Sequence, residues 1–205
     1  MNLNQFQSAA NLSAGLAARW FQPLTDTMAE FGINTPKRQA AFIAQIGCES
    51  AGFSTLAESF NYSIQGLKDT FAGRLSAYQC EMLGRSGNRP AQQTAIANLV
   101  YQGRYGNKAP GDGWKFRGRG LKQVTFLDNY RQCGNTLGID LVANPDLLLV
   151  DKYAARSAGW FWQLHNLNQY ADNGDFNQMT KVINGGTNGL SDRRSRLKIA
   201  EGALL

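Results

Sequence analysis

The sequence is poor in the residues that build metal centres and disulfide frameworks. Its 205 residues include one histidine, His165, and three cysteines, Cys48, Cys80 and Cys133. The cysteines form no CxxC pair and none has a histidine beside it, which argues against a disulfide framework and against a structural zinc site. We expect three buried thiols, with a single Cys–Cys pair as the alternative. One histidine excludes a histidine-rich metal centre, and we expect neither a metal nor another cofactor.

Long apolar runs are absent as well. No stretch approaches the roughly 18 apolar residues that a membrane span needs. The first residues, MNLNQF, have neither the basic segment nor the apolar run of a secretory signal. With 43% hydrophobic and 18% charged residues, the chain is typical of a folded domain and not of a disordered one. We expect a monomer that is made in the cytoplasm without a signal peptide and has no stable membrane insertion.

Acidic residues are also few, and this gives the chain a basic balance. Fifteen Asp and Glu stand against 21 Lys and Arg, for a formal net charge of +6. Six basic residues fall in the basic segment (residues 104–122), with Asp112 as its single acid. Such an excess favours an anionic partner, and a solvated loop without a partner is the alternative. The segment lacks regularly spaced aromatic residues for base stacking, so we expect no nucleic acid partner.

The spacing of apolar residues predicts a mostly helical chain. A glycine-rich stretch over residues 105–120 is expected to form a loop with short strands. These features predict a single α+β domain over residues 1–205, with residues of about 66–111 as an inserted helical lobe. Helices are expected over residues 13–31 with Ser13 as N-cap, from Thr35–Pro36 toward Gly52, from Ser63, from Pro90 to about residue 101, over 126–137 with Thr125 and Asp128 as a capping box, from Asn144–Pro145, from Asp151, over 175–183, and from near Ser191.

Glu49 is the first candidate catalytic residue. On the helix that begins at Pro36, Phe42, Ile46 and Glu49 follow one another at i, i+4 and i+7, which places the carboxylate on the apolar stripe. Glu49 also lies in the last helical turn, where the helix dipole disfavours negative charge. Burial and dipole together are expected to raise its pKa, as a general acid requires. The alternative is a glutamate that turns outward at a fraying helix end.

Glu58 is the second candidate, nine residues further on in a polar segment where it is expected to stay ionised. Two carboxylates in unlike surroundings suggest an acid and a base and not a pair of metal ligands. Inverting glycoside hydrolysis places them about 6.5–9.5 Å apart, and retaining hydrolysis about 5–5.5 Å. The sequence separation permits either distance.

Six segments in this order resemble glycoside hydrolase family 19, which includes plant-type chitinases and many phage endolysins, and the phage endolysin branch resembles this chain most. They span roughly residues 36–200. The segments are residues 41–50 (AFIAQIGCES), 58–63 (ESFNYS), 116–125 (FRGRGLKQVT), 144–147 (NPDL), 160–162 (WFW) and 183–186 (INGG).

The resemblance implies a mainly α, lysozyme-like fold with two helical lobes, a cleft and a minimal β element. It also implies an inverting mechanism. Glu49 would protonate the glycosidic oxygen, and Glu58 would take a proton from the attacking water. Thr125, which also reads as an N-cap, would hold that water with its hydroxyl group.

The same resemblance implies substrate-binding residues. Gln123, Asn129 and Asn184 match family positions that line the sugar cleft, and side-chain amides suit the recognition of hydroxyl and N-acetyl groups. An arginine near the C-terminus is also expected in the site. Arg193 and Arg196 are both candidates, and Arg196 is the one we assign.

Peptidoglycan and chitin share a β-1,4-linked N-acetylhexosamine backbone, so the motifs do not separate them. We expect peptidoglycan as the substrate, because the positive charge suits an anionic wall and favours electrostatic attraction to the bacterial envelope. An endolysin of this kind would reach the wall after release by a holin and lyse the host. The alternatives are a chitinase and, from a different class, a wall-binding module without catalysis.

Overall fold

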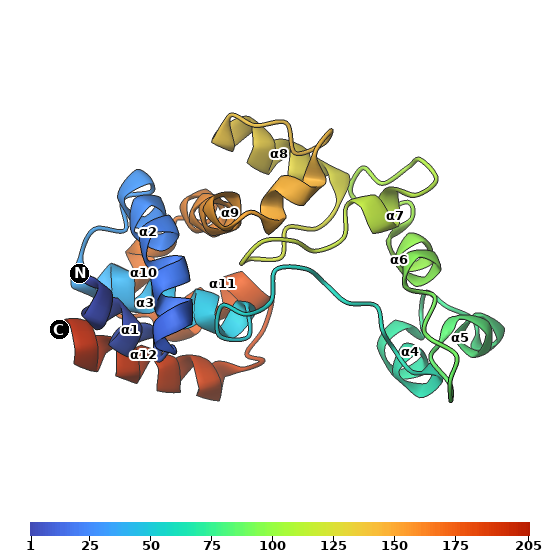
Figure 1. The fold of residues 1–205 in the computed structure, drawn as a ribbon, viewed down its shortest axis with the longest axis horizontal. Coiled ribbons are helices and arrows are strands. Elements are labelled where there is room, and N and C mark those ends of the chain that lie inside the picture. Colours follow the sequence, from blue (N-terminus) through green and yellow to red (C-terminus); the bar gives the residue numbers. More distant parts are fainter. The chain divides into compact units, whose positions relative to one another are not determined.

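The computed structural model describes residues 1–205, and helices make up nearly all of its regular structure (Figure 1). It contains no β-strand, and its only β pairing is four isolated bridges, among them Ala57 with Arg119 and Arg119 with Val124. The mainly α prediction is therefore confirmed. The elements are α1 (Leu3–Ala10), α2 (Ala14–Glu30), α3 (Pro36–Glu49), α4 (Ile64–Phe71), α5 (Ala77–Leu83), α6 (Gln93–Tyr101), α7 (Asp112–Lys115), α8 (Leu127–Leu137), the 3₁₀ helix η1 (Pro145–Leu149), α9 (Asp151–Leu164), α10 (Leu167–Asn173), α11 (Phe176–Asn184) and α12 (Leu190–Leu204).

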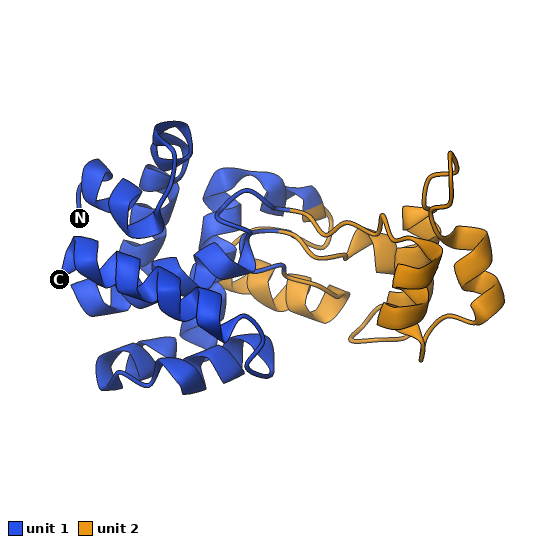
Figure 2. Ribbon diagram, turned by 90° about the horizontal axis from the view of Figure 1, so that it is seen from below, with its two compact units in different colours: residues 1–56, 120–123, 146–205 blue, residues 57–119, 124–145 orange.

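The chain divides into two compact units, which Figure 2 colours separately. Unit 1 contains residues 1–56, 120–123 and 146–205, and unit 2 contains residues 57–119 and 124–145. The expected lobe of about 66–111 falls within unit 2, which also includes α7 and α8. The sequence enters unit 2 directly after Leu56, so Glu49 belongs to unit 1 and Glu58 to unit 2.

Aromatic side chains from α2, α3 and α9 form much of the core of unit 1. Phe42 of α3 and Trp162 of α9 are buried and meet edge to face, with ring centroids 5.2 Å apart. Trp20 of α2 is buried and donates its indole N–H to the carbonyl of Phe53 at 2.9 Å. A Cβ at Gly159 of α9 would come within 2.2 Å of the Phe31 ring, so glycine allows the close packing there.

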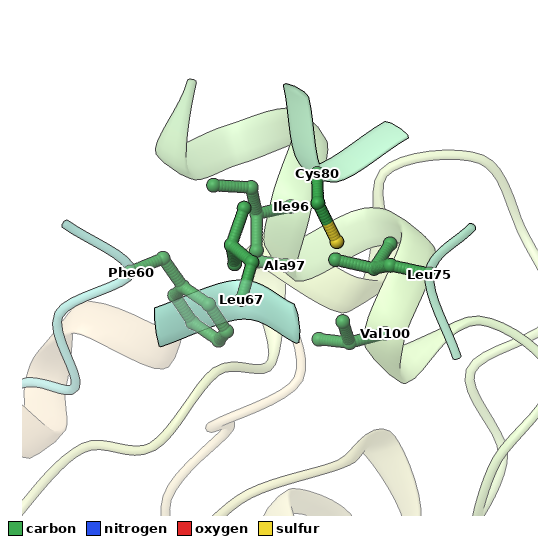
Figure 3. Close-up of a cluster of buried hydrophobic side chains, with 7 residues drawn as sticks. All are labelled: Phe60, Leu67, Leu75, Cys80, Ile96, Ala97 and Val100. Atoms are coloured by element: carbon green, nitrogen blue, oxygen red, sulfur yellow. The ribbon is translucent and has the colours of Figure 1, made fainter. Parts of the chain in front are cut away.

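Unit 2 has a hydrophobic cluster of its own (Figure 3). Its side chains come mainly from α4, α5 and α6, so three short helices that could not be stable alone bury one another's apolar faces. Cys80 contributes as a small apolar side chain. The cluster consists of Phe60, Leu67, Leu75, Cys80, Ile96, Ala97 and Val100.

Most predicted helix starts agree with the structure. Ser13, Thr35 and Ser63 each accept a backbone N–H three residues along and cap α2, α3 and α4. The capping box at Thr125 is wrong, because the N-cap of α8 is Phe126, which has a φ of +75° and makes no side-chain cap. The helix expected from Pro90 begins later, at Gln93.

Four short helices were not predicted. They are α1, α5, α7 and α10, and none is longer than eight residues. The expected helix after Asn144 is a single 3₁₀ segment, and the glycine-rich stretch 105–120 contains α7 but no strand. Helices of this length have too little periodicity to identify from sequence.

All three cysteines are free, with Cys80 and Cys133 buried and Cys48 half-buried. His165 follows α9 and lies against Phe161, with ring centroids 4.2 Å apart, although its side chain is exposed. No group of three or more His, Cys, Asp or Glu side chains gathers at one place. None of the helices has the length and apolar character needed to cross a bilayer.

Candidate active site

Helix α3 places Glu49 at the edge of the core of unit 1. Thr35 caps the helix and Pro36 occupies its first turn. Every residue from Ala40 to Gly47 is buried, and Glu49 is the last residue of the helix. Its side chain is 13% exposed. The predicted burial of Glu49 in the last turn is therefore confirmed, and the alternative of an outward-turned side chain is not.

Two cations hold the carboxylate of Glu49. Lys122 Nζ lies 2.7 Å from Oε2, and the Arg193 guanidinium pairs with Oε1. Both cationic side chains are themselves largely buried, at 12% and 4% exposed. Ion pairs so shielded from water are stronger than surface pairs, but losing one partner leaves a buried charge uncompensated.

These cations reverse the pKa shift expected for Glu49. Burial raises the pKa of this carboxyl, but the charge and hydrogen bond of Lys122 and those of Arg193 outweigh burial. The pKa of Glu49 therefore lies below its ordinary value of 4.5. The predicted rise is wrong, because it counted burial and the helix dipole but not partners from distant segments.

A chain of buried polar groups positions Arg193. Its Nη1 donates to Oε1 of Gln45 at 2.6 Å, and the Gln45 amide donates to the hydroxyl of Thr180 at 2.9 Å. All three side chains are buried, so their hydrogen bonds are costly to break. These hydrogen bonds link α12, α3 and α11 next to Glu49.

The close packing of Gly120 against α9 positions Lys122, two residues further along the chain. Gly120 has a φ of +78°, and a Cβ there would lie 2.6 Å from the hydroxyl oxygen of Ser157 in α9. Its N–H donates to the carbonyl of Leu56 at 2.9 Å. Only glycine fits this backbone and this space, so the short segment 120–123 is tied to unit 1 and carries Lys122 to Glu49.

Neutral donors hold Glu58 in unit 2. The Tyr101 hydroxyl donates to Oε1 at 2.7 Å, and the Gly118 N–H donates to Oε2 at 3.1 Å. The backbone N–H of Glu58 donates in turn to the Gly118 carbonyl at 2.8 Å. Burial and the charge of Glu58 raise the pKa of Tyr101, so its hydroxyl remains a proton donor. Glu58 is half-buried and fixed at both oxygens.

Comparisons with known proteins identify the family of the chain. The model of the family described as chitinase class I matches residues 16–175. A glycosyl hydrolase family 19 domain-containing protein of Haemophilus influenzae is 34% identical over 180 residues, which cover 84% of this chain and 83% of that protein. The chain belongs to glycoside hydrolase family 19. It is therefore a glycosidase.

Solved structures of bacterial chitinases support the fold. Chitinase C of Streptomyces griseus aligns over 99% of this chain and 91% of its own, with a TM-score of 0.64 and 19% identity. Another bacterial family 19 chitinase aligns over 99% of this chain and 94% of its own, with a TM-score of 0.66 and 22% identity. At these identities the likeness shows that the fold is the family 19 lysozyme-like fold.

The remaining residues that the family resemblance assigns fall in both units, and their roles stay predictions. Thr125 and Asn129 lie in unit 2, where the Asn129 amide donates to the Thr125 carbonyl at 2.8 Å. Gln123 and Asn184 lie in unit 1. The Gln123 amide donates to the Gly120 carbonyl at 3.0 Å, and the Asn184 amide donates to the Asn188 carbonyl at 3.4 Å. Thr125 is half-buried after Val124, and its role as a water-holding residue stays a prediction.

The two candidate arginines of α12 contact different carboxylates, and the substrate-binding role assigned to Arg196 stays a prediction. Arg196 pairs with Asp192 one turn earlier on α12, at 2.8 Å, whereas Arg193 contacts Glu49. Residues three apart lie on the same side of a helix, so the sequence alone did not choose between the two arginines. The arginine of the Glu49 site is Arg193.

Sequence reasoning missed two residues that hold the carboxylates, Lys122 and Tyr101, and one that positions Arg193, Gln45. Lys122 lies inside the recognised 116–125 motif and the basic segment, so its charge and position were signals for it. Tyr101 ends α6, and Gln45 lies inside the 41–50 motif one turn before Glu49. Nothing in the sequence indicates that Tyr101 reaches Glu58, because 43 residues separate them.

Proposed function

We propose that this family 19 enzyme hydrolyses the β-1,4-linked glycan backbone of peptidoglycan by an inverting mechanism, with Glu49 as general acid and Glu58 as general base, and that it acts as an endolysin on the bacterial wall. The observation that carries the proposal is the pair of carboxylates in unlike surroundings. Glu49 is held by two cations and Glu58 by a hydroxyl group and a backbone N–H.

In this mechanism the proton of Glu49 passes to the glycosidic oxygen as the bond from that oxygen to the anomeric carbon breaks. Glu58 takes a proton from a water molecule, whose oxygen forms the new bond to the anomeric carbon from the opposite face. The Tyr101 and Gly118 donors keep the Glu58 carboxylate oriented toward that water. The hydroxyl of Thr125 is the proposed second partner of the water.

The cations around Glu49 are expected to make the rate of the reaction decrease as pH rises. A proton donor must be protonated when the sugar binds, but Lys122 and Arg193 keep the pKa of Glu49 low in the free protein. The active fraction therefore decreases as pH rises above that pKa. We expect kcat/KM to be greatest at acid pH.

Charge favours peptidoglycan over chitin. The protein carries a net charge of +6, and the basic segment contributes six positive side chains. Bacterial walls and envelopes are polyanionic, whereas chitin is neutral, so the charge concentrates the enzyme at a wall and not at chitin. This attraction is expected to weaken as salt is added.

The test compares the two polymers directly. Purified Gram-negative sacculi and N-acetylglucosamine hexamers are incubated with the wild-type enzyme and with the Glu58→Gln variant. The products are identified by mass spectrometry, and the anomer first formed is identified by proton NMR during the reaction. New reducing ends from sacculi, released as the inverted anomer by wild type only, are expected. Release of the retained anomer, or full lysis by Glu58→Gln, would contradict the mechanism.

Chitin is the second candidate substrate because the family description and the solved structures name chitinases. The matching family model is described as chitinase class I, and both solved structures compared above are chitinases. Cleavage of the hexamers at a much higher kcat/KM than sacculi would select this function instead.

A further inference from the structure

An exposed tyrosine lies close to Glu58 in unit 2. Tyr105, in the loop between α6 and α7 (Figure 1), is 62% exposed and has a φ of +38°. A positive φ is rare for an aromatic residue and costs free energy that the surrounding structure must offset. An exposed aromatic ring on a strained backbone is not explained by the packing of a core.

The loop that presents Tyr105 is rigid. Asn107 is fully buried, and its side chain donates to the Tyr101 carbonyl at 3.3 Å and accepts the Leu127 N–H at 2.9 Å. The Gly103 N–H donates to the Asn107 carbonyl at 2.8 Å and closes the loop. Asn107 thus ties the end of α6, the loop and the start of α8 together.

The loop is also pressed against α8. A Cβ at Gly106 would lie 2.4 Å from Oδ1 of Asp128, and the Asp128 N–H donates to the Tyr105 carbonyl at 3.1 Å. The backbone on both sides of the Tyr105 ring is therefore held. A rigid aromatic ring loses little conformational entropy when a ligand binds to it.

A row of aromatic contacts joins Tyr105 to the carboxylate of Glu58. The rings of Tyr105 and Phe126 have centroids 4.9 Å apart, and those of Phe126 and Tyr101 are 4.8 Å apart. The Tyr101 hydroxyl then donates to Glu58. Two ring contacts and one hydrogen bond therefore separate the exposed ring from the carboxylate, all within unit 2.

Arg104 supports the two outer rings. Its guanidinium carbon lies 4.9 Å from the centroid of Phe126 and 5.8 Å from that of Tyr105. A cation attracts the negative face of an aromatic ring, so Arg104 helps to hold both rings in place. Phe126 is half-buried beneath, and most of Tyr105 stays open to solvent.

We propose that the ring of Tyr105 is a stacking platform for a pyranose ring of the glycan chain on which Glu58 acts, more than two sugar units from the cleaved bond. This inference rests on the proposed function. One face of a β-linked pyranose carries axial C–H groups, and their weak positive charge suits the negative face of an aromatic ring. A long glycan would reach Tyr105, and a short fragment would not.

Unit 2 offers a matched control. Tyr78 on α5 is also a highly exposed tyrosine, at 72%, and no aromatic ring or cation lies on its ring. Its replacement removes the same exposed side chain without touching the row of rings that leads to Glu58. A general loss of surface aromatic area would affect both variants equally.

The experiment measures hydrolysis by wild type, Tyr105→Ala, Tyr105→Phe and Tyr78→Ala on long glycan strands and on tetrasaccharides. We expect Tyr105→Ala to raise KM about five- to tenfold on long strands, with kcat within about twofold, and to leave tetrasaccharide hydrolysis unchanged. Tyr105→Phe and Tyr78→Ala should match wild type, and thermal unfolding checks that each variant folds.

Three results would overturn the proposal: an unchanged KM for Tyr105→Ala, an equal loss on both lengths, or an equal loss in Tyr78→Ala. A binding assay distinguishes failure of the stacking proposal from failure of the proposed function. Glu58→Gln, with and without Tyr105→Ala, is co-sedimented with sacculi and with chitin beads. If wild type cleaves neither polymer, the proposed function fails, and weaker sedimentation by the Tyr105→Ala form still supports the platform. Equal sedimentation rejects it.

Discussion

Glu49 and Glu58 are nine residues apart in the chain, but their carboxylates are held in different ways. Glu49 ends a buried helix and is held by the positive charges of Lys122 and Arg193. Glu58 lies in an irregular segment and is held by the neutral donors of Tyr101 and Gly118. We therefore expect the two glutamates to respond differently to mutation.

The difference has a physical origin. Charged partners stabilise the ionised form of a carboxyl and bring buried charges of their own, which depend on the carboxylate in return. Neutral donors orient a carboxylate without leaving a charge behind when it is removed. The expected effects of substitution follow from this contrast.

The largest effect is expected on catalysis. Glu49→Gln and Glu58→Gln should each lower kcat by about 10³-fold or more, because each removes a proton-transfer group. Release of reducing ends from sacculi measures the loss. If one variant keeps more than about a tenth of wild-type activity, its carboxylate is not an acid or base of the reaction.

The next effect distinguishes the two carboxylates by stability. Glu49→Gln leaves two largely buried cations without their anion and should lower the free energy of unfolding by on the order of 3 kcal/mol. Glu58→Gln leaves no cation behind, and the amide oxygen can still accept one of the two hydrogen bonds, so a smaller loss of about 1.5 kcal/mol is expected. Urea unfolding near pH 7 measures both, and equal losses would contradict the comparison.

The same difference should depend on pH. Because the pKa of Glu49 is lowered on folding, its stabilising contribution is complete above its ordinary pKa of 4.5 and is lost as pH falls from there through the folded value. The stability gap between wild type and Glu49→Gln should therefore narrow below pH 4.5. A gap that stays constant to pH 3 would show that the ion pairs do not stabilise the fold.

A smaller effect identifies the role of Glu49. Lys122→Met removes one of the two cations that lower the pKa of Glu49 and should therefore raise that pKa. If Glu49 is the general acid, the alkaline limb of the kcat/KM profile moves to higher pH. Movement of the acid limb would instead identify Glu49 as the general base. The control is Lys181→Met, which removes an exposed lysine of α11 and should move neither limb.

The smallest effect concerns Thr125. Thr125→Val should change the free energy of unfolding by less than about 0.5 kcal/mol, because Phe126 and not Thr125 is the N-cap of α8. Ser63→Ala, which removes the cap of α4 in the same unit, should cost about 1 kcal/mol. A larger stability loss in Thr125→Val than in Ser63→Ala would restore the capping role.

Much of the fold could be predicted because its signals are local. Ser13 and the Thr35–Pro36 pair mark the starts of α2 and α3, since capping involves only the next three residues. Short helices such as α5 and α10 lacked such a signal, because packing and not periodicity stabilises them. The Thr125 motif matched a capping box, but the backbone of Phe126 turns away from the required conformation.

The site was predictable in its carboxylates and not in their partners. Glu49 was identified from its place on an apolar stripe, and its burial was confirmed. Its pKa was predicted in the wrong direction, because Lys122 is 73 residues away in the chain and Arg193 is 144 residues away. The contact of Arg193 with Glu49 was missed for the same reason, and the assignment of Arg196 as a substrate-binding residue stays a prediction.

The amino-acid sequence by itself determined the helical class, the main helix starts, the two candidate carboxylates and the family, because hydrophobic period, capping and motif order are properties of neighbouring residues. Only the tertiary structure decided which charges meet Glu49, which hydroxyl holds Glu58, and which aromatic ring remains exposed beside it. Electrostatic and hydrogen-bond energies fall steeply over a few ångströms, and distances of that size between remote residues exist only after the chain has folded.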